Sequence, residues 1–221
     1  MRIWTILQIF KNHIMNNDFP FPDNQDKLFK EFNDDFRHNA IIRTGIDQFL
    51  LFSEAYKTAA TKLFEQLDGS ALDANVLVYP LIFLNRQFLE LRLKELIVGL
   101  NFTIFHERKF TIGHNLKCLW DTYKDLVLQI ETINIPDAKI LKNTENLILE
   151  FNSIDSNSIS FRYPVDKAEN PSLNMTNVDL QNFMTTMRKL YNFFDTQSDL
   201  VFHMVDLTED LIDYMRSCYE H

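Results

Sequence analysis

Two side chains in the middle of the chain are of types that can act in phosphate chemistry. Arg108 and His114 are separated by five residues. A histidine can move protons, and an arginine can stabilise the charge that develops on a phosphate during RNA cleavage. His114 follows Gly113 and is predicted to open a helix, where free backbone N–H groups attract anions. The alternatives are that His114 only caps or packs the helix start, and that the two side chains do not meet across an irregular segment.

The other histidines and cysteines follow no pattern of metal binding. The six histidines form no HExxH or paired carboxylate–His motif, and the chain has no CxxC. No P-loop, GxGxxG or GxSxG is present, and four glycines in the whole chain are too few for a Gly-rich phosphate-binding loop. We therefore expect neither metal nor cofactor. His203 and Cys118 are interpreted as helix-packing residues, and Cys118 and Cys218 as buried free thiols, with a disulfide as the alternative.

The charge of the chain limits the classes of function. A formal net charge of -9 argues against a protein that coats nucleic acid non-specifically. Residues 85–124 nevertheless hold seven Lys or Arg against four Asp or Glu, which permits a local basic surface, whereas residues 176–221 hold three against eight. No apolar run is long enough to cross a bilayer, and the apolar start of the chain has no cleavage site. The sequence predicts a cytoplasmic protein without a membrane partner.

Hydrophobic periodicity predicts an all-α protein. The scarcity of glycine argues for a few long helices rather than a sheet with many tight turns. Apolar residues at helical spacing predict the following helices: residues 42–67, 72–100 with a kink or fresh start at Pro80, 114–130, 176–194 and 200–215, with shorter ones near 26–36 and 136–151. Ile3, Leu7, Phe10 and Ile14 fall on one further stripe. Residues 101–113 and 152–175 are expected to be irregular.

These helices are expected to form one domain over residues 1–221. It would comprise N-terminal helices in residues 1–70, a core in residues 71–196 and a C-terminal helix in residues 197–221. The helix predicted over residues 72–100 is apolar on two opposite sides, which is typical of a helix at the centre of a bundle.

Arg86 falls inside one of these apolar stripes. A buried, unpaired guanidinium is strongly unfavourable, so Arg86 needs a partner, and Glu90, one turn later, is the nearest carboxylate. Three interpretations remain. Arg86 forms a structural ion pair that holds the long loop, or it lines a pocket for phosphate or RNA, or its side chain extends to solvent.

Three short motifs occur in a characteristic order. They are Arg86-Gln-Phe-Leu-Glu-Leu-Arg-Leu-Lys-Glu-Leu-Ile97, Gly113-His114-Asn115-Leu116 and Phe161-Arg162-Tyr163-Pro164. The first resembles a helix that carries a glutamate before a leucine–lysine–alanine run, the second a Thr-His-Asp-Leu helix start, and the third an Arg-Tyr-Pro segment before a last long helix. Together, over residues 81–195, they resemble the HEPN superfamily (higher eukaryotes and prokaryotes nucleotide-binding helical domains).

This resemblance implies an antiparallel helical bundle, here with an N-terminal helical extension, that is often dimeric and occurs in toxin–antitoxin and phage-defence settings. It makes the following residues candidates for binding: Arg86, Glu90, Lys94, His114, Arg162 and Tyr163. Active ribonucleases of the family carry an Arg and, after four to six residues, a His within one late helix. This chain departs from that pattern, because Arg188 has no His and His203 no Arg at such a distance.

Three functions remain open from the sequence. The first is a nucleotide- or RNA-binding module of a bacterial defence or toxin–antitoxin-like system. The second is a metal-independent ribonuclease that uses His114 with Arg108 or Arg162. The third is a non-catalytic scaffold whose N-terminal helix and bundle face form a homodimer or dock a partner protein.

Overall fold

The computed structural model describes residues 21–30, 36–67, 69, 71–130 and 137–219. The chain divides into two compact units, residues 1–42 and 43–221, and the expected single domain stays a prediction. In the first unit, the described helical segment is the short η1 (Phe36–His38). The helix predicted over residues 26–36 is wrong for residues 26–30, because Asp23 and Asp26 bind nearby backbone N–H groups in a turn. The stripe of residues 3–14 lies outside the described residues.

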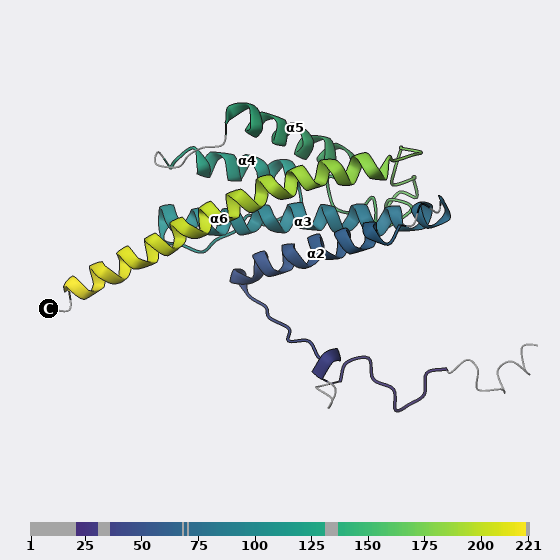
Figure 1. Ribbon diagram of the computed structural model, residues 1–221, viewed down its shortest axis with the longest axis horizontal. Coiled ribbons are helices and arrows are strands. Elements are labelled where there is room, and N and C mark those ends of the chain that lie inside the picture. The colour runs from purple at the N-terminus through teal and green to yellow at the C-terminus, as the bar shows by residue number, and fades with distance from the viewer. Residues whose placement is uncertain (1–20, 31–35, 68, 70, 131–136, 220–221) are drawn as a thin grey trace, which may run out of the picture. The chain divides into compact units, whose positions relative to one another are not determined.

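The second unit holds the long helices of the described chain. They are η2 (Ile46–Gln48), α2 (Phe49–Glu65), α3 (Ala71–Phe105), α4 (Leu116–Val127), α5 (Ala138–Ile154) and α6 (Leu180–Tyr219) (Figure 1). Over the described ranges the chain forms no strand and only an isolated bridge between Val165 and Pro171. The all-α prediction is therefore confirmed.

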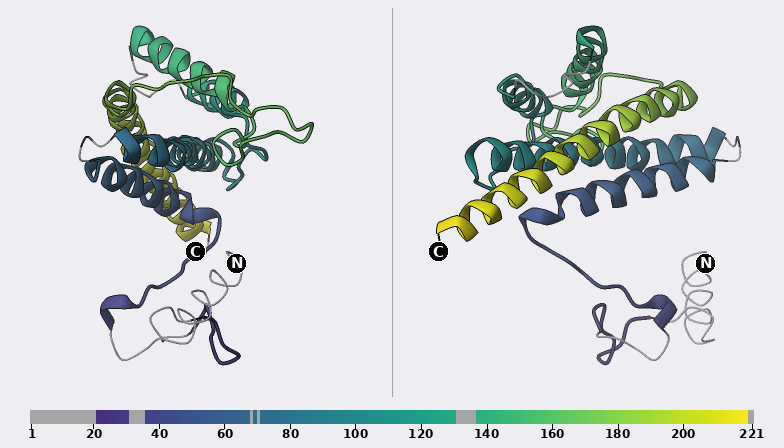
Figure 2. Two further views of the ribbon diagram at one scale, coloured as in Figure 1. Left: turned by 90° about the vertical axis from the view of Figure 1, so that its right-hand side faces the viewer. Right: turned by 60° about the vertical axis from the view of Figure 1, so that its left-hand side comes forward.

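Helix α3 lies at the centre of this unit. It packs against α2, α4 and α6, while α5 packs against α4 (Figures 1 and 2). Its two apolar sides are both buried: Leu81 and Phe88 lie on one side, and Leu89, Leu93 and Leu96 on the other, all without exposed surface. The two-sided pattern in the sequence thus reflects a central position in the bundle.

Two helices are longer than the sequence predicts. Helix α3 runs without interruption through Pro80 and ends only at Phe105, where His106 adopts a positive φ of 58°. Helix α6 joins the two helices predicted over residues 176–194 and 200–215. The joining residues 195–199 contain neither Gly nor Pro, so nothing in them breaks a helix.

Some side chains expected to be buried are exposed. Cys118, Cys218 and His203 are exposed, and both thiols are free. Helix α4 buries Leu119, Trp120 and neighbouring apolar residues, so Cys118 falls on its outer side. The predictions of buried thiols and of packing roles for Cys118 and His203 are wrong. Among the described helices, none combines the length and hydropathy needed to cross a membrane.

Candidate functional site

The guanidinium of Arg86 joins three segments of the second unit. Its side chain has no exposed surface. Nε donates to the carbonyl of Asp155 at 3.3 Å, Nη1 to Oε2 of Glu90 at 3.3 Å, and Nη2 to the carbonyl of His114. Burial lowers the pKa of Arg86, and the carboxyls of Glu90 and Asp155 act in the opposite direction. This geometry is that of a structural ion pair holding the start of the long loop, and the interpretation that Arg86 extends to solvent is wrong.

Glu90 is the acceptor at the centre of this cluster. Only 2% of the residue is exposed, and its Oε1 accepts from Nζ of Lys94 at 2.8 Å and faces Nδ1 of His114 at 2.9 Å. Burial acts to raise the pKa of Glu90, but the hydrogen bonds from Lys94 and His114 outweigh it and hold the pKa below its ordinary value. Glu90 is therefore ionised at neutral pH and balances the buried cations beside it.

His114 is the exposed member of the cluster, with 66% of its side chain open to solvent. Because Glu90 holds Nδ1, the other ring nitrogen, Nε2, is the one left to exchange a proton with a ligand or with water. A carboxylate that orients an accessible imidazole is an arrangement used in general acid–base catalysis.

The start of α4 differs from the expectation for His114. The N-cap is Asn115, whose Oδ1 accepts from the backbone N–H of Cys118 at 3.0 Å. The N–H of Lys117 donates to Oδ1 of Asn152 at 3.3 Å. Capping by His114 is therefore wrong, and these two N–H groups are already used within the protein rather than free to attract an anion.

The Arg86–Glu90 cluster also fixes the turn that leads to Arg162. Asp155 is 1% exposed, and its Oδ1 accepts from the N–H groups of Ile159 at 2.7 Å and Ser160 at 3.0 Å. Oγ of Ser158 accepts from Nε2 of Gln87 on α3 at 2.6 Å. Since the carbonyl of Asp155 also binds Arg86, helix α3 holds both ends of this turn.

Arg162 leaves this turn with its guanidinium near the surface. Its Nε donates to the carbonyl of Ser158 at 2.5 Å. The guanidinium carbon lies 5.7 Å from the ring centres of both Phe83 and Tyr163. Residues 155–163 therefore present Arg162 and Tyr163 side by side as exposed groups on a turn fixed to α3.

Arg162 and Tyr163 line a hollow of about 410 Å³ together with Tyr79, Ser160 and Ser172. Tyr163 is 56% and Tyr79 51% exposed. Oγ of Ser172 is buried and has no hydrogen-bond partner among the residues that the structure describes. Arginine, tyrosine and hydroxyl groups are all able to bind a phosphate or stack on a base.

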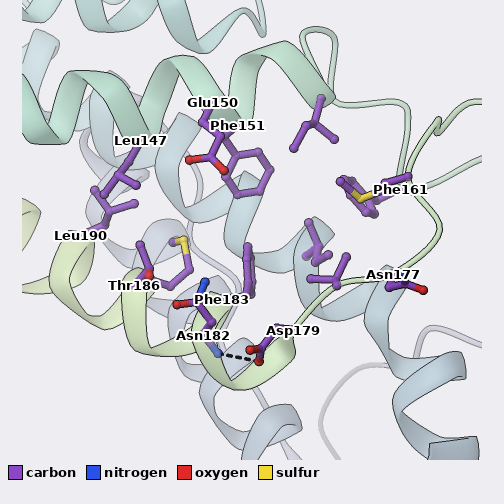
Figure 3. Close-up of a pocket in the computed structure, with 15 residues that line it drawn as sticks. Leu147, Glu150, Phe151, Phe161, Asn177, Asp179, Asn182, Phe183, Thr186 and Leu190 are labelled. Atoms are coloured by element: carbon purple, nitrogen blue, oxygen red, sulfur yellow. Dashed lines mark hydrogen bonds between the residues drawn. The ribbon is translucent and has the colours of Figure 1, made fainter.

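A second hollow, of about 290 Å³, adjoins the first between α5 and α6 (Figure 3). Its wall is mainly apolar and includes the rings of Phe151, Phe161 and Phe183. Its polar side chains are Glu150, Asn177, Asp179, Asn182 and Thr186, with no Lys or Arg. Phe161 and Met175 line both hollows, so the two are neighbours that share part of their wall.

Arg108 binds partners away from this cluster. Its Nη1 donates to Asp47 at 2.8 Å and its Nη2 to Glu209 at 2.6 Å. Its guanidinium carbon lies 4.7 Å from the ring centre of Phe102. His114 binds Glu90 instead, so the pair considered for RNA cleavage, Arg108 and His114, has no partner in common.

A second buried charge cluster was not found from the sequence. Arg92 is 1% exposed, and it donates to Ser198 at 3.1 Å, to Asp195 at 3.2 Å and to Glu54. Burial raises the pKa of Glu95 in this cluster, and Arg92 acts in the opposite direction. The only local signal is the spacing of Arg92 and Glu95 on an otherwise apolar helix, while the other partners are distant in sequence. This cluster joins α2, α3 and α6.

Within the described residues, no group of three or more His, Cys, Asp or Glu is arranged to hold a metal ion. Comparison with known proteins found no family model, no curated protein and no solved structure that matches the chain.

Proposed function

We propose that this protein is a divergent HEPN-like protein that binds a nucleotide or RNA in the two adjoining hollows beside Arg162. The observation that carries the proposal is that Arg162 and Tyr163 lie at the first hollow on a turn that Arg86 and Gln87 fix to the central helix. A site held in this way needs little reordering when a ligand binds.

The chemistry of the two hollows suits the two ends of a nucleotide. The guanidinium of Arg162 offers forked donors to a phosphate, and the exposed ring of Tyr163 offers a stacking surface to a neighbouring base of an RNA. The second hollow combines aromatic walls with Asp179, Asn182 and other acceptors, and it holds no cation. It would repel phosphate and suit the amino-bearing edge of a base. The phosphate therefore belongs at Arg162 and the base between α5 and α6.

The candidate binding residues divide into two groups by exposure. Arg86, Glu90 and Lys94 are buried, so their role is to position the neighbouring segments. His114, Arg162 and Tyr163 are the exposed candidates that can touch a ligand.

Fluorescence anisotropy with labelled ATP, labelled GTP and a labelled single-stranded RNA tests this proposal. Arg162→Ala should weaken binding by about tenfold, which corresponds to ~1.4 kcal/mol. Lys167→Ala removes another exposed cation of the same loop and should change the affinity less than about twofold, as expected for a rim charge. Absence of binding to all three probes at about 1 mM, or equal losses in the two variants, would contradict the proposal.

The second candidate function is metal-independent ribonuclease activity, which the Glu90–His114 pair favours. The exposed imidazole could transfer protons at a ribose 2′-hydroxyl while Arg162 balances phosphate charge. Cleavage of a labelled RNA in excess EDTA should fall by about 100-fold in His114→Ala. Intact RNA after incubation with the wild-type protein across the range from about pH 5 to 9 would remove this candidate.

A further inference from the structure

The second hollow, between α5 and α6, is lined by groups that accept hydrogen bonds. Within the described residues, its charged side chains are Glu150 and Asp179, and its neutral polar ones are Asn177, Asn182 and Thr186. An ionised carboxylate accepts hydrogen bonds and donates none. The hollow is therefore suited to a ligand edge that carries N–H groups.

Glu150 has the carboxylate that is open to a ligand. Oδ1 of Asp179 already accepts from the backbone N–H of Asn182 at 2.9 Å, at the start of α6 (Figure 3). The carboxylate of Glu150, in contrast, has no hydrogen bond or ion pair with any residue that the structure describes. Figure 3 shows it extending from α5 toward the hollow, which Asn182 and Thr186 line from α6. Both oxygens of Glu150 are thus available to the same ligand.

Aromatic rings form the wall beside Glu150. Phe151 and Phe161 are 8% and 7% exposed, and the ring of Phe151 meets that of Phe183 edge to face, with 6.1 Å between the ring centres. Such a wall offers its faces to a planar base and keeps water from part of the base edge. Where water is partly excluded, hydrogen bonds are stronger and an unpaired polar group is more costly. A base whose edge does not match Glu150 is therefore bound less well.

Guanine is the base whose edge matches a single carboxylate. Its N1–H and its N2 amino group are adjacent donors, and a carboxylate can accept both in parallel, as it does from the fork of an arginine. Adenine and cytosine carry a ring acceptor beside the amino group, and uracil carries a carbonyl on each side of its N–H, so each turns a lone pair toward the carboxylate. The remaining acceptor of this edge of guanine, O6, suits the side-chain amide of Asn182.

We propose that the second hollow selects guanine over the other bases, with Glu150 accepting from N1–H and from the N2 amino group. This selectivity rests on the proposed nucleotide site and names its substrate class. The guanine can belong to a free nucleotide or to a guanosine of RNA, since both present the same edge.

Competition against labelled GTP in the anisotropy assay tests the selectivity with the wild-type protein. The competitors are unlabelled GTP, ATP and inosine triphosphate, which keeps N1–H and O6 of guanine but lacks the N2 amino group. GTP should bind at least about tenfold more tightly than ATP, because ATP offers no pair of adjacent donors. GTP should also bind about tenfold more tightly than inosine triphosphate, which leaves one oxygen of Glu150 without a partner.

A matched set of variants assigns the selectivity to Glu150. Glu150→Gln should weaken GTP at least about tenfold and change the affinity for ATP less than about threefold, because the carboxamide places a donor against the donors of guanine. Glu65→Gln removes the same charge from an exposed residue of α2 that lines neither hollow, and it should change neither affinity more than about twofold. Arg162→Ala, at the phosphate end, should weaken GTP and ATP by the same factor.

A short single-stranded RNA of uridines with one guanosine, compared with the same RNA carrying inosine there, tests the second source of guanine. A preference for guanosine in the RNA alone identifies RNA as the ligand, and a preference among the free nucleotides alone identifies a nucleotide. Equal affinities within both sets, or equal effects of Glu150→Gln on GTP and ATP, overturn the selectivity and leave the nucleotide site standing. Absence of binding to every nucleotide and RNA overturns both.

Discussion

At Arg86, a fully buried charge is tolerated because its nitrogens donate to Glu90 and to two backbone carbonyls. Such a cluster contributes modestly to stability as a whole, but removal of one partner is costly because the remaining charges stay buried. Glu90→Gln would leave Arg86 and Lys94 without their carboxylate. We expect urea titration to give a free energy of unfolding that is lower by about 3 kcal/mol.

Glu209 provides the control for that substitution. Its Oε1 accepts from Nη2 of Arg108 at 2.6 Å, and 48% of its side chain is exposed. Because ion pairs near water contribute little, Glu209→Gln should cost less than about 1 kcal/mol. Equal losses in the two variants would contradict the central role of Glu90.

The same cluster predicts a pH dependence of stability. The folded-state pKa of Glu90 lies below its ordinary value of 4.5. The stability that comes from its ionised form is therefore complete above pH 4.5 and is lost as the pH falls through the lower folded-state pKa. Other carboxyls act in the same direction, among them Glu145, whose pKa falls to about 2 because of hydrogen bonds from Lys124 and Lys142. The informative quantity is thus the difference in the free energy of unfolding between the wild type and Glu90→Gln.

Free energies of unfolding measured between about pH 7 and 3 give that difference. The gap between the wild type and Glu90→Gln should narrow as the pH falls, since protonation removes the same charge that the substitution removes. A gap that stays constant over this range would mean that the ionised form of Glu90 makes no special contribution.

Among the elements, α3 and α6 are in close contact at Gly99. A Cβ atom placed there would collide with Cγ1 of Val201 and lie 3.5 Å from Cγ2 of Val205. Replacement of Gly by Ala inside a helix normally stabilises by about 0.5–1 kcal/mol. At this crossing we expect the opposite sign, with Gly99→Ala lowering the free energy of unfolding by about 1–3 kcal/mol.

Val201→Ala makes room for the added methyl group. In a double-mutant cycle followed by thermal or urea unfolding, Gly99→Ala should therefore cost less in the Val201→Ala background, with a coupling energy of about 1 kcal/mol or more. Stabilisation by Gly99→Ala alone would show that α3 and α6 can separate there at no cost.

Sequence periodicity located the helices because amphipathic spacing is a local property of each helix. It missed the junction in α6 because the apolar stripe changes sides near residues 195–199, although no breaker interrupts the backbone. The end of α3 at Phe105 was missed because it depends on the backbone conformation of His106. Helix boundaries set by tertiary contacts or by a single dihedral angle leave little trace in the sequence pattern.

The sequence pattern likewise revealed only part of the candidate site. A charged residue inside an apolar stripe revealed Arg86, and the spacing of one helical turn revealed its bond to Glu90. The partners of Arg92 could not be found in this way, because Glu54 and Asp195 come from other helices. The depression between α5 and α6 was also not predicted, since it depends on how two helices and a loop are packed.

For the whole molecule, a net charge of -9 and a single exposed arginine in the proposed site limit how salt affects RNA binding. For single-stranded RNA, the logarithm of the affinity falls with the logarithm of salt concentration by about 0.7 for each phosphate neutralised. With one phosphate contact from Arg162, the expected slope is about -0.7, and a second phosphate contact would bring it to about -1.4. Arg162→Ala should make the slope shallower by about 0.7, whereas Lys167→Ala should leave the slope unchanged.

Anisotropy titrations between about 50 and 300 mM salt measure this slope. A slope steeper than about -3 would require an extended basic surface, and the acidic second hollow beside Arg162 would then lie off the path of the RNA backbone.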